Sequence, residues 1–177
     1  MEDEMKGLWG QGTFTEKPLP HDKTPIKTRF VYKIKRTADG AVERYKARLV
    51  ARGFTQRKGI DFFETFSPVV GFDVMRTVLA TAALHRWTVG MLDFTQAYLN
   101  APLLEDVWLQ LPNKTVVKAD KALYGLKQSA VQWFKELRST ILSEDWHSSH
   151  YDGCLYYRQA KDGRVACLLY TSPSPRD

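Results

Sequence analysis

Two stretches of alternating residues, joined by a turn signal, constrain the fold of this chain most. In Phe30–Arg36 (FVYKIKR), aromatic and aliphatic side chains alternate with Val31 and lysines, a pattern that predicts a half-buried strand. Residues 38–40 (ADG) are typical of a tight turn, and Val42–Ala51 is the expected return strand. We therefore expect an antiparallel hairpin with one cationic face, which carries Lys33, Lys35, Lys46 and Arg48.

The charge is concentrated around this hairpin. Between Lys17 and Lys58 there are 13 lysines or arginines and three acids, so this region has an excess of +10 within a chain of net charge +6. The remaining residues have a net charge of −4. A basic half joined to a mildly acidic half favours a polyanionic partner at the basic end, although solvated basic faces are also common.

The composition excludes some classes of protein. No window of 18 apolar residues is present, so we expect no transmembrane span and no membrane partner. The acidic start MEDEMKG lacks the apolar core of a secretory signal, which favours an intracellular location. Cys154 and Cys167 are expected to be free buried thiols, and a disulfide between them stays an alternative.

The other expected elements follow from periodicity. Residues 1–20 mix acids, glycine and proline and predict an irregular lead-in. Amphipathic helices are expected over Val74–His85, with Asp73 as N-cap, and over Ala130–Leu142. Ser129 and Gln132 have the spacing of a capping box for the second helix. Short strands are expected at Val107–Leu111, Thr115–Val117, Asp152–Gln159 and Arg164–Tyr170, the last two as a hairpin.

A carboxylate stands at the end of an apolar run. Val89–Leu92 predicts a buried strand, and Asp93 follows it directly. An unpaired buried carboxylate is costly, so such an acid usually has a partner, often a metal ion. Asp93 could equally cap the next helical turn, and the spacing alone does not separate these two interpretations.

Four blocks of sequence together resemble a known family. They are RYKARLVARGFTQRKGIDFFETFSPVV, LDFTQAYLN, KALYGLKQSAVQWF and DGCLYY, in this order. In order and spacing they resemble the reverse transcriptase of Ty1/copia-type retrotransposons over roughly residues 30–170, which is more specific than any single motif. The function implied is that of a fragment of an RNA-directed DNA polymerase. A nucleic-acid-binding domain without catalysis, or a retroelement remnant without a role, is the alternative.

The resemblance implies an α+β fold that is part of a fingers–palm polymerase. The basic hairpin would belong to the fingers, and an antiparallel sheet packed on helices would form the palm. The implied organisation is an irregular lead-in (1–25), fingers and partial palm (26–170) and a mobile tail unrelated to the family (171–177). The implied partners are an RNA template, a DNA primer, deoxynucleotide triphosphates and the remainder of a retrotransposon polyprotein, within a retroelement particle in the cytoplasm or nucleus.

The resemblance also implies roles for single residues. Asp93 matches the first catalytic aspartate, a metal ligand, and Phe94 matches the residue whose backbone carbonyl helps to hold the metal. Tyr98 matches the aromatic residue under the incoming sugar. The other residues expected near the nucleotide are Lys46, Arg48, Ala97, Tyr124 and Gly125. Those expected along the nucleic acid are Lys33, Lys35, Arg52, Lys127 and Gln128.

One departure from the family bears on catalysis. The family continues after the ACLLY strand with Val-Asp-Asp, whereas here Thr171, Ser172 and Pro173 follow Tyr170. The family cofactor is Mg²⁺, and two such ions need several carboxylates. Because Asp93 alone cannot hold both ions, we expect the chain as written to be inactive. His147, His150 and Cys154 resemble a set of zinc ligands, but in the family this block is structural.

Overall fold

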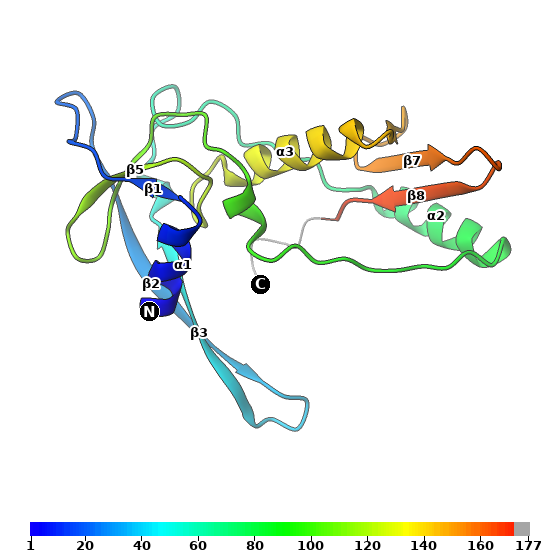
Figure 1. Cartoon of the computed structure of the whole chain (residues 1–177), viewed down its shortest axis with the longest axis horizontal. Helices are drawn as coiled ribbons and strands as arrows, with labels where there is room; N and C mark the ends of the chain where they lie inside the picture. The colour runs from blue at the N-terminus through cyan, green and yellow to red at the C-terminus, as the bar shows by residue number, and fades with distance from the viewer. Residues whose placement is uncertain (172–177) are drawn as a thin grey trace. The chain divides into compact units, whose positions relative to one another are not determined.

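The computed structural model describes residues 1–171, and the tail expected over 171–177 lies outside these residues except for Thr171. The chain divides into two compact units (Figure 1). The first unit contains Met1–Phe66 and Gln96–Glu136, and the second contains Ser67–Thr95 and Leu137–Asp177.

The first unit is built on a five-stranded mixed sheet in the order β1-β5-β4-β2-β3. Its strands are β1 (Phe14–Thr15), β2 (Ile26–Arg36), β3 (Val42–Ala51), β4 (Trp108–Gln110) and β5 (Val116–Ala119). All neighbours are antiparallel except β2 and β4, which are parallel. Two short 3-10 turns, η1 (Gly53–Thr55) and η2 (Ala97–Asn100), complete the unit together with helix α1 (Glu2–Gly10).

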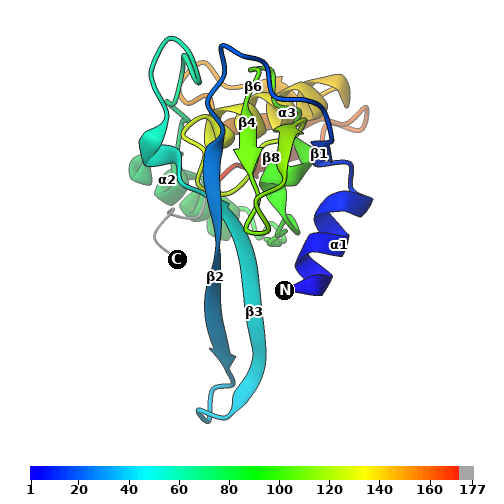
Figure 2. The same ribbon diagram turned by 90° about the vertical axis from the view of Figure 1, so that its left-hand side faces the viewer.

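The predicted basic hairpin is confirmed as β2 and β3. Its return strand has the expected bounds, while β2 begins four residues before Phe30, because Ile26 and Lys27 pair with β4. The expectation of half-burial holds only near the base. Leu49 and Ala51 are buried there, whereas Tyr32, Ile34 and Tyr45 are exposed. In Figure 2 the far end of the hairpin extends beyond the other strands of its unit.

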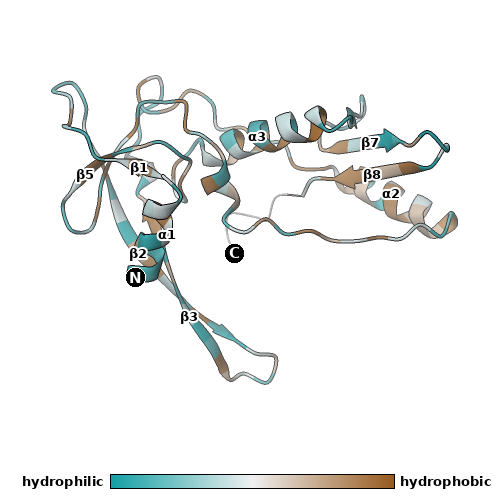
Figure 3. Cartoon of the chain, in the orientation of Figure 1, coloured by the Kyte–Doolittle hydropathy of each residue, from teal (hydrophilic) through white to brown (hydrophobic). Residues whose placement is uncertain are grey.

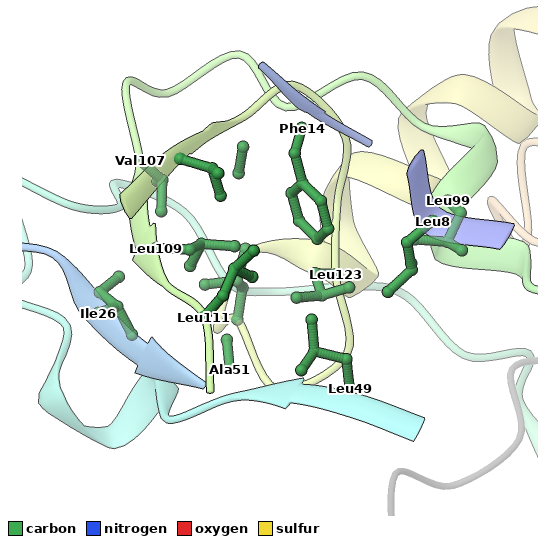
Figure 4. Close-up of a cluster of buried hydrophobic side chains, with 13 residues drawn as sticks. Leu8, Phe14, Ile26, Leu49, Ala51, Leu99, Val107, Leu109, Leu111 and Leu123 are labelled. Atoms are coloured by element: carbon green, nitrogen blue, oxygen red, sulfur yellow. The ribbon is translucent and has the colours of Figure 1, made fainter. Parts of the chain in front are cut away.

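A hydrophobic core joins these strands to α1. Its members come from every strand of the unit, from α1 and from the segments before α3, and Figure 4 shows the labelled side chains pointing toward one another. Leu8, Leu49, Leu109 and Val117 are completely buried. The burial of such side chains stabilises the folded state by about 1.5–3 kcal/mol each.

Helix α1 corrects the expectation of an irregular lead-in. Leu8 is completely buried in the core, and Met5 packs against it. The Glu4 carboxylate accepts a hydrogen bond from the Leu49 amide at 3.2 Å. Because β3 is an edge strand of the sheet, this contact satisfies one of its outward-facing amides. The helix lies beside β3 (Figure 2).

The second unit contains helix α2 (Phe72–Leu84) and an antiparallel sheet in the order β6-β7-β8. These strands are β6 (His147–Ser148), β7 (Leu155–Gln159) and β8 (Val165–Leu169), so the expected final hairpin is confirmed and β6 was missed. Helix α3 (Ser129–Ser143) contributes its first half to one unit and its second half to the other. Trp133, Leu137 and Ile141 on α3 are buried as expected.

Two expected helix caps are wrong. The N-cap of α2 is Gly71, and Asp73 lies in the first turn without a capping bond. At the start of α3, the Ser129 hydroxyl donates to the Leu123 carbonyl at 2.5 Å, and the Gln132 amide donates to the Glu105 carboxylate. Both side chains that the capping box would use are therefore hydrogen-bonded to groups outside the helix.

The expected strand Val89–Leu92 is also wrong. The segment has no regular structure, and Val89, Met91 and Leu92 are 64%, 95% and 86% exposed. A strand needs a partner for its backbone amides, and among residues 1–171 none pairs with this segment. The preceding helix α2 is also largely apolar, and Figure 3 colours it mostly white to brown. Only Ala82 of this helix is buried, however.

Candidate functional site

The cationic face of the hairpin follows from its register. Lys33 lies directly opposite Lys46, Lys35 opposite Arg44, and Val31 opposite Arg48. Residues directly opposite each other share a face, and faces alternate along each strand. The five basic residues therefore share one face, which we call the cationic face. Burial lowers the pKa of Lys46, the positive charges of Arg48, Lys35 and Arg44 lower it further, and Glu4 opposes them.

Arg48, at the base of this face, takes part in a small aromatic cluster. Its guanidinium carbon lies 4.6 Å from the ring centre of Tyr124. The rings of Tyr124 and Tyr98 are 5.0 Å apart and inclined at 59°. We call these three residues the Arg48–Tyr124–Tyr98 cluster. They come from β3, from the segment before α3 and from η2, so the fold of the first unit brings together three residues that the resemblance implied near the nucleotide.

Ala97 and Gly125 support the cluster from the backbone. Ala97 begins η2, the turn that carries Tyr98. Gly125 has a φ of +90°, and a Cβ atom there would lie 2.2 Å from the Ala51 carbonyl oxygen. The Ala51 amide donates to the Tyr124 carbonyl at 2.8 Å. Gly125 therefore permits the close crossing of its segment over the end of β3, a geometry that a residue with a side chain would strain.

The residues expected along the nucleic acid differ in their environment. Arg52 stacks on Phe54, with its guanidinium carbon 5.1 Å from the ring centre. The Lys127 ammonium lies 4.7 Å from the centre of the Phe62 ring and donates to the Gln56 carbonyl at 3.3 Å. Gln128 departs from the expectation, because its side chain is completely buried and hydrogen-bonded within the protein. A side chain so placed is not exposed to a ligand.

Asp93 and Phe94 lie in the second unit, in the exposed segment that follows α2. Among residues 1–171, no group of three or more His, Cys, Asp or Glu side chains could hold a metal ion. A two-magnesium centre needs several carboxylates, so the donors in this part of the chain do not fit one. His147, His150 and Cys154 do not form such a group either within the described residues. Burial first, and then the Asp152 charge, raise the pKa of the Cys154 thiol to about 11.

Comparison with known proteins identifies the family. A family model described as "Reverse transcriptase (RNA-dependent DNA polymerase)" matches residues 11–172. The chain belongs to the reverse transcriptase family. It is 38% identical over 177 residues to the "Retrovirus-related Pol polyprotein from transposon TNT 1-94" of Nicotiana tabacum, covering 96% of this chain and 13% of the polyprotein.

Two further relatives of this reverse transcriptase fragment are also transposon polyproteins. The polyprotein from transposon RE1 of Arabidopsis thaliana is 38% identical over 161 residues, which is 86% of the chain and 11% of that polyprotein. The Ty1-H Gag-Pol polyprotein of Saccharomyces cerevisiae is 28% identical over 150 residues, or 79% of the chain and 8% of the polyprotein. No solved structure matches the chain.

No helix in residues 1–171 is both long and apolar enough to cross a membrane.

Sequence reasoning missed one residue around the cluster of this reverse transcriptase fragment. Gln56 is buried and hydrogen-bonds to both Lys127 and Gln128. Nothing in the sequence around it indicates this, because a glutamine in a polar, irregular stretch is ordinarily exposed. Its partners lie 71 and 72 residues away along the chain, so only the tertiary fold reveals the contact.

Proposed function

We propose that this chain is the fingers and part of the palm of an RNA-directed DNA polymerase, and that it binds template, primer and nucleotide. The fingers would contain the hairpin of β2 and β3, and the palm would contain Asp93 and the sheet β6-β7-β8. This assignment applies to residues 26–170, with α1 and its connection as a lead-in. The observation that carries the proposal is the Arg48–Tyr124–Tyr98 cluster.

The chemistry of the cluster suits a nucleotide. The cationic face supplies ammonium and guanidinium groups for phosphate oxygens. Arg48 places its guanidinium over the Tyr124 ring, which in turn contacts the Tyr98 ring. Aromatic rings stack on bases and sugars, while basic side chains neutralise phosphates. Lys46 lies on the same face as Arg48, so either residue can reach a triphosphate that rests there. Lys33 and Lys35 extend the basic track toward the end of the hairpin.

We further propose that the chain does not transfer nucleotides. Divalent metal ions are the cofactors that the reverse transcriptase family uses, and when bound they activate the primer hydroxyl and neutralise the leaving pyrophosphate. In this chain Asp93 would be a ligand through its carboxylate and Phe94 through its carbonyl. The positions of the other two family aspartates hold Ser172 and Pro173, so the ligand set is incomplete.

Primer extension tests this proposal. Purified chain 1–177 is incubated with Mg²⁺, deoxythymidine triphosphate and an oligo-dT primer on a poly-A template, beside Asp93→Ala. We expect no incorporation by either protein. Incorporation by the unchanged chain that Asp93→Ala abolishes would show that Asp93 has partner acids and would overturn the proposed inactivity. Restoring Val-Asp-Asp at 171–173, with the strand continued, is the change that we expect activity to require.

A non-catalytic nucleic-acid-binding domain is the second candidate. The cationic face favours it, because phosphate contacts alone account for such binding. It differs from the polymerase proposal in giving no role to Tyr98 and Tyr124. The folded double variant Tyr98→Leu/Tyr124→Leu should bind single-stranded nucleic acid more weakly under the polymerase proposal and with unchanged affinity under this one.

A further inference from the structure

Two glutamine side chains meet inside the first unit, next to the segment that carries Tyr124. Gln56 follows η1 and is 5% exposed, and Gln128 precedes α3 and is completely buried. The Gln56 side-chain amide donates to the Gln128 side-chain oxygen at 2.9 Å. Buried side-chain amides are costly unless they are hydrogen-bonded, so this pair needs further partners.

The backbone supplies those partners and fixes the orientation of both amides. The Gln56 Oε1 atom accepts a hydrogen bond from the Lys127 amide at 2.8 Å. Only an oxygen can accept there, so Gln56 Nε2 must face Gln128 Oε1. Gln128 Nε2 then faces the Asp61 carbonyl and donates to it at 2.9 Å. Each bond in this series determines the next, and together they join residues 56–61 to residues 127–128.

The same segment is held on its other side by a backbone crossing. A Cβ atom on Gly53 would lie 1.9 Å from the Gly125 carbonyl oxygen, and 3.0 Å from Gln56 Oε1. The Ala51 amide donates to the Tyr124 carbonyl. Residues 124–128 are therefore fixed at one end by β3 and at the other end by the glutamine pair. Tyr124 begins this short span, so these contacts fix the backbone from which its ring meets Arg48 and Tyr98.

We propose that Gln56 and Gln128 are positioning residues, whose buried amide pair holds the Tyr124 ring in place for nucleic acid. Gln128 thus acts through Tyr124 rather than by touching the ligand. The part of the proposal that concerns nucleic acid rests on the function proposed above. The part that concerns the position of Tyr124 rests only on the hydrogen bonds and burial of the first unit.

The test uses methionine, which resembles glutamine in length and lacks its hydrogen-bonding groups. Gln128→Met and Gln56→Met are compared with Gln132→Met, a matched control. Gln132 is also buried in the first unit, but its amide donates to the Glu105 carboxylate. Any general cost of removing a buried glutamine therefore affects the control too. All measurements are made at a temperature at which each variant is folded, well below the midpoint of its thermal unfolding.

Tyrosine nitration by tetranitromethane reports the position of Tyr124 without any ligand. Peptide mass spectrometry gives its rate relative to that of Tyr45, which is 79% exposed in the same molecule. We expect this ratio to rise about threefold or more in Gln128→Met and Gln56→Met, through local opening, and to stay constant in Gln132→Met. An unchanged ratio in the two folded variants, or an equal rise in the control, overturns the proposal.

Binding of a fluorescein-labelled oligothymidylate, measured by anisotropy, tests the remaining part. We expect weaker binding by Gln128→Met and Gln56→Met, with the same salt dependence as the unchanged chain, because the phosphate contacts stay in place. A raised nitration ratio with unchanged affinity keeps the positioning of Tyr124 and overturns its role at the nucleic acid. If Gln128→Met does not fold, Gln56→Glu replaces it, since the carboxylate still accepts from Lys127 and no longer donates to Gln128.

Discussion

At the scale of single residues, the site depends on groups whose chemistry is ordinary and whose placement is unusual. Gly125 is the clearest example. Its left-handed φ and its contact with the Ala51 carbonyl each exclude a side chain, and both follow from the crossing of two backbone segments. A glycine between a tyrosine and a leucine predicts none of this from sequence. Gly125 contributes to the site by allowing the neighbouring Tyr124 to lie next to β3.

Gly125→Ala should be strongly destabilising. Gly40→Ala is the matched control, because Gly40 has a similar φ of +87° with open space around it. We expect the control to lower the free energy of unfolding by about 1 kcal/mol through its φ, and Gly125→Ala by about 3 kcal/mol or more, because the added methyl group also meets backbone. Urea titration gives both values. Equal losses would contradict the close crossing of the Gly125 segment over the end of β3.

Cys154 predicts a pH dependence of stability. Its thiol pKa is about 11 in the folded chain and 9.0 otherwise. Between these values the folded state keeps a proton that the unfolded state releases, so the free energy of unfolding falls as the pH rises. The full effect is about 2–3 kcal/mol at about 1.4 kcal/mol per unit. Urea titrations at pH 8.5 and 10.5 should show a steeper fall for the unchanged chain than for Cys154→Ala, and parallel falls would exclude this role for Cys154.

At the scale of elements, periodic patterns correctly predicted the helices and strands whose formation depends mainly on local sequence. The β2–β3 hairpin, α3 and the β7–β8 hairpin were predicted with small errors at their ends, because their alternation, turn residues and apolar spacing all agree. Helix α1 was missed, since two glycines weaken its pattern and the burial of Leu8 decides the outcome. The prediction of a strand at Val89–Leu92 was wrong because an apolar run does not specify which segment will pair with it.

The same reasoning applies to the candidate site. The family resemblance indicated the residues of the Arg48–Tyr124–Tyr98 cluster as neighbours of the nucleotide, but not that Tyr124 contacts both of the others. Gln128 was expected along the nucleic acid, but its side chain is completely buried, where it meets Gln56 from 72 residues away. A polar side chain becomes a core residue only when the fold supplies its hydrogen-bond partners, and those partners are not visible in a single sequence.

Asp152 joins two elements of the second unit. One carboxylate oxygen accepts from the Gly71 amide, the N-cap of α2, at 2.8 Å, and the other accepts from the Cys154 amide at 2.7 Å. Asp152→Asn places an NH₂ group against one of these donors, so we expect the free energy of unfolding to fall by about 2 kcal/mol. Asp162→Asn, in the exposed turn before β8, is the control and should change it by less than about 0.5 kcal/mol. Similar effects from both would refute the linking role.

At the scale of the whole molecule, charge rather than catalysis dominates the expected behaviour. The basic excess between Lys17 and Lys58 lies largely on one hairpin, whereas the rest of the chain is mildly acidic. Nucleic acid should therefore bind at one end of the chain, weakly and without sequence preference, whether or not nucleotide transfer occurs. Nucleic-acid binding can therefore be measured on this chain independently of nucleotide transfer.

Salt dependence measures the number of phosphate contacts. For single-stranded DNA, the slope of log K against log salt should become less negative by about 0.7 for each contact that is lost. We expect such a change for Lys33→Ala/Lys35→Ala. The charge-matched variant Arg158→Ala/Lys161→Ala, on exposed residues of the second unit, should keep the original slope. If the affinity of the unchanged chain does not depend on salt, the proposal of polyanion binding is wrong.

The register of the hairpin has a thermodynamic consequence of its own. Lys33 opposite Lys46, and Lys35 opposite Arg44, repel each other across the strands, so the far end of the hairpin is less stable than its backbone pairing alone would make it. An anion that lies between these pairs removes the repulsion and, by linkage, stabilises the ordered hairpin. Ligand affinity and hairpin order therefore rise together. In amide hydrogen exchange, the strand ends near the turn should exchange more slowly when nucleic acid is bound than when it is absent.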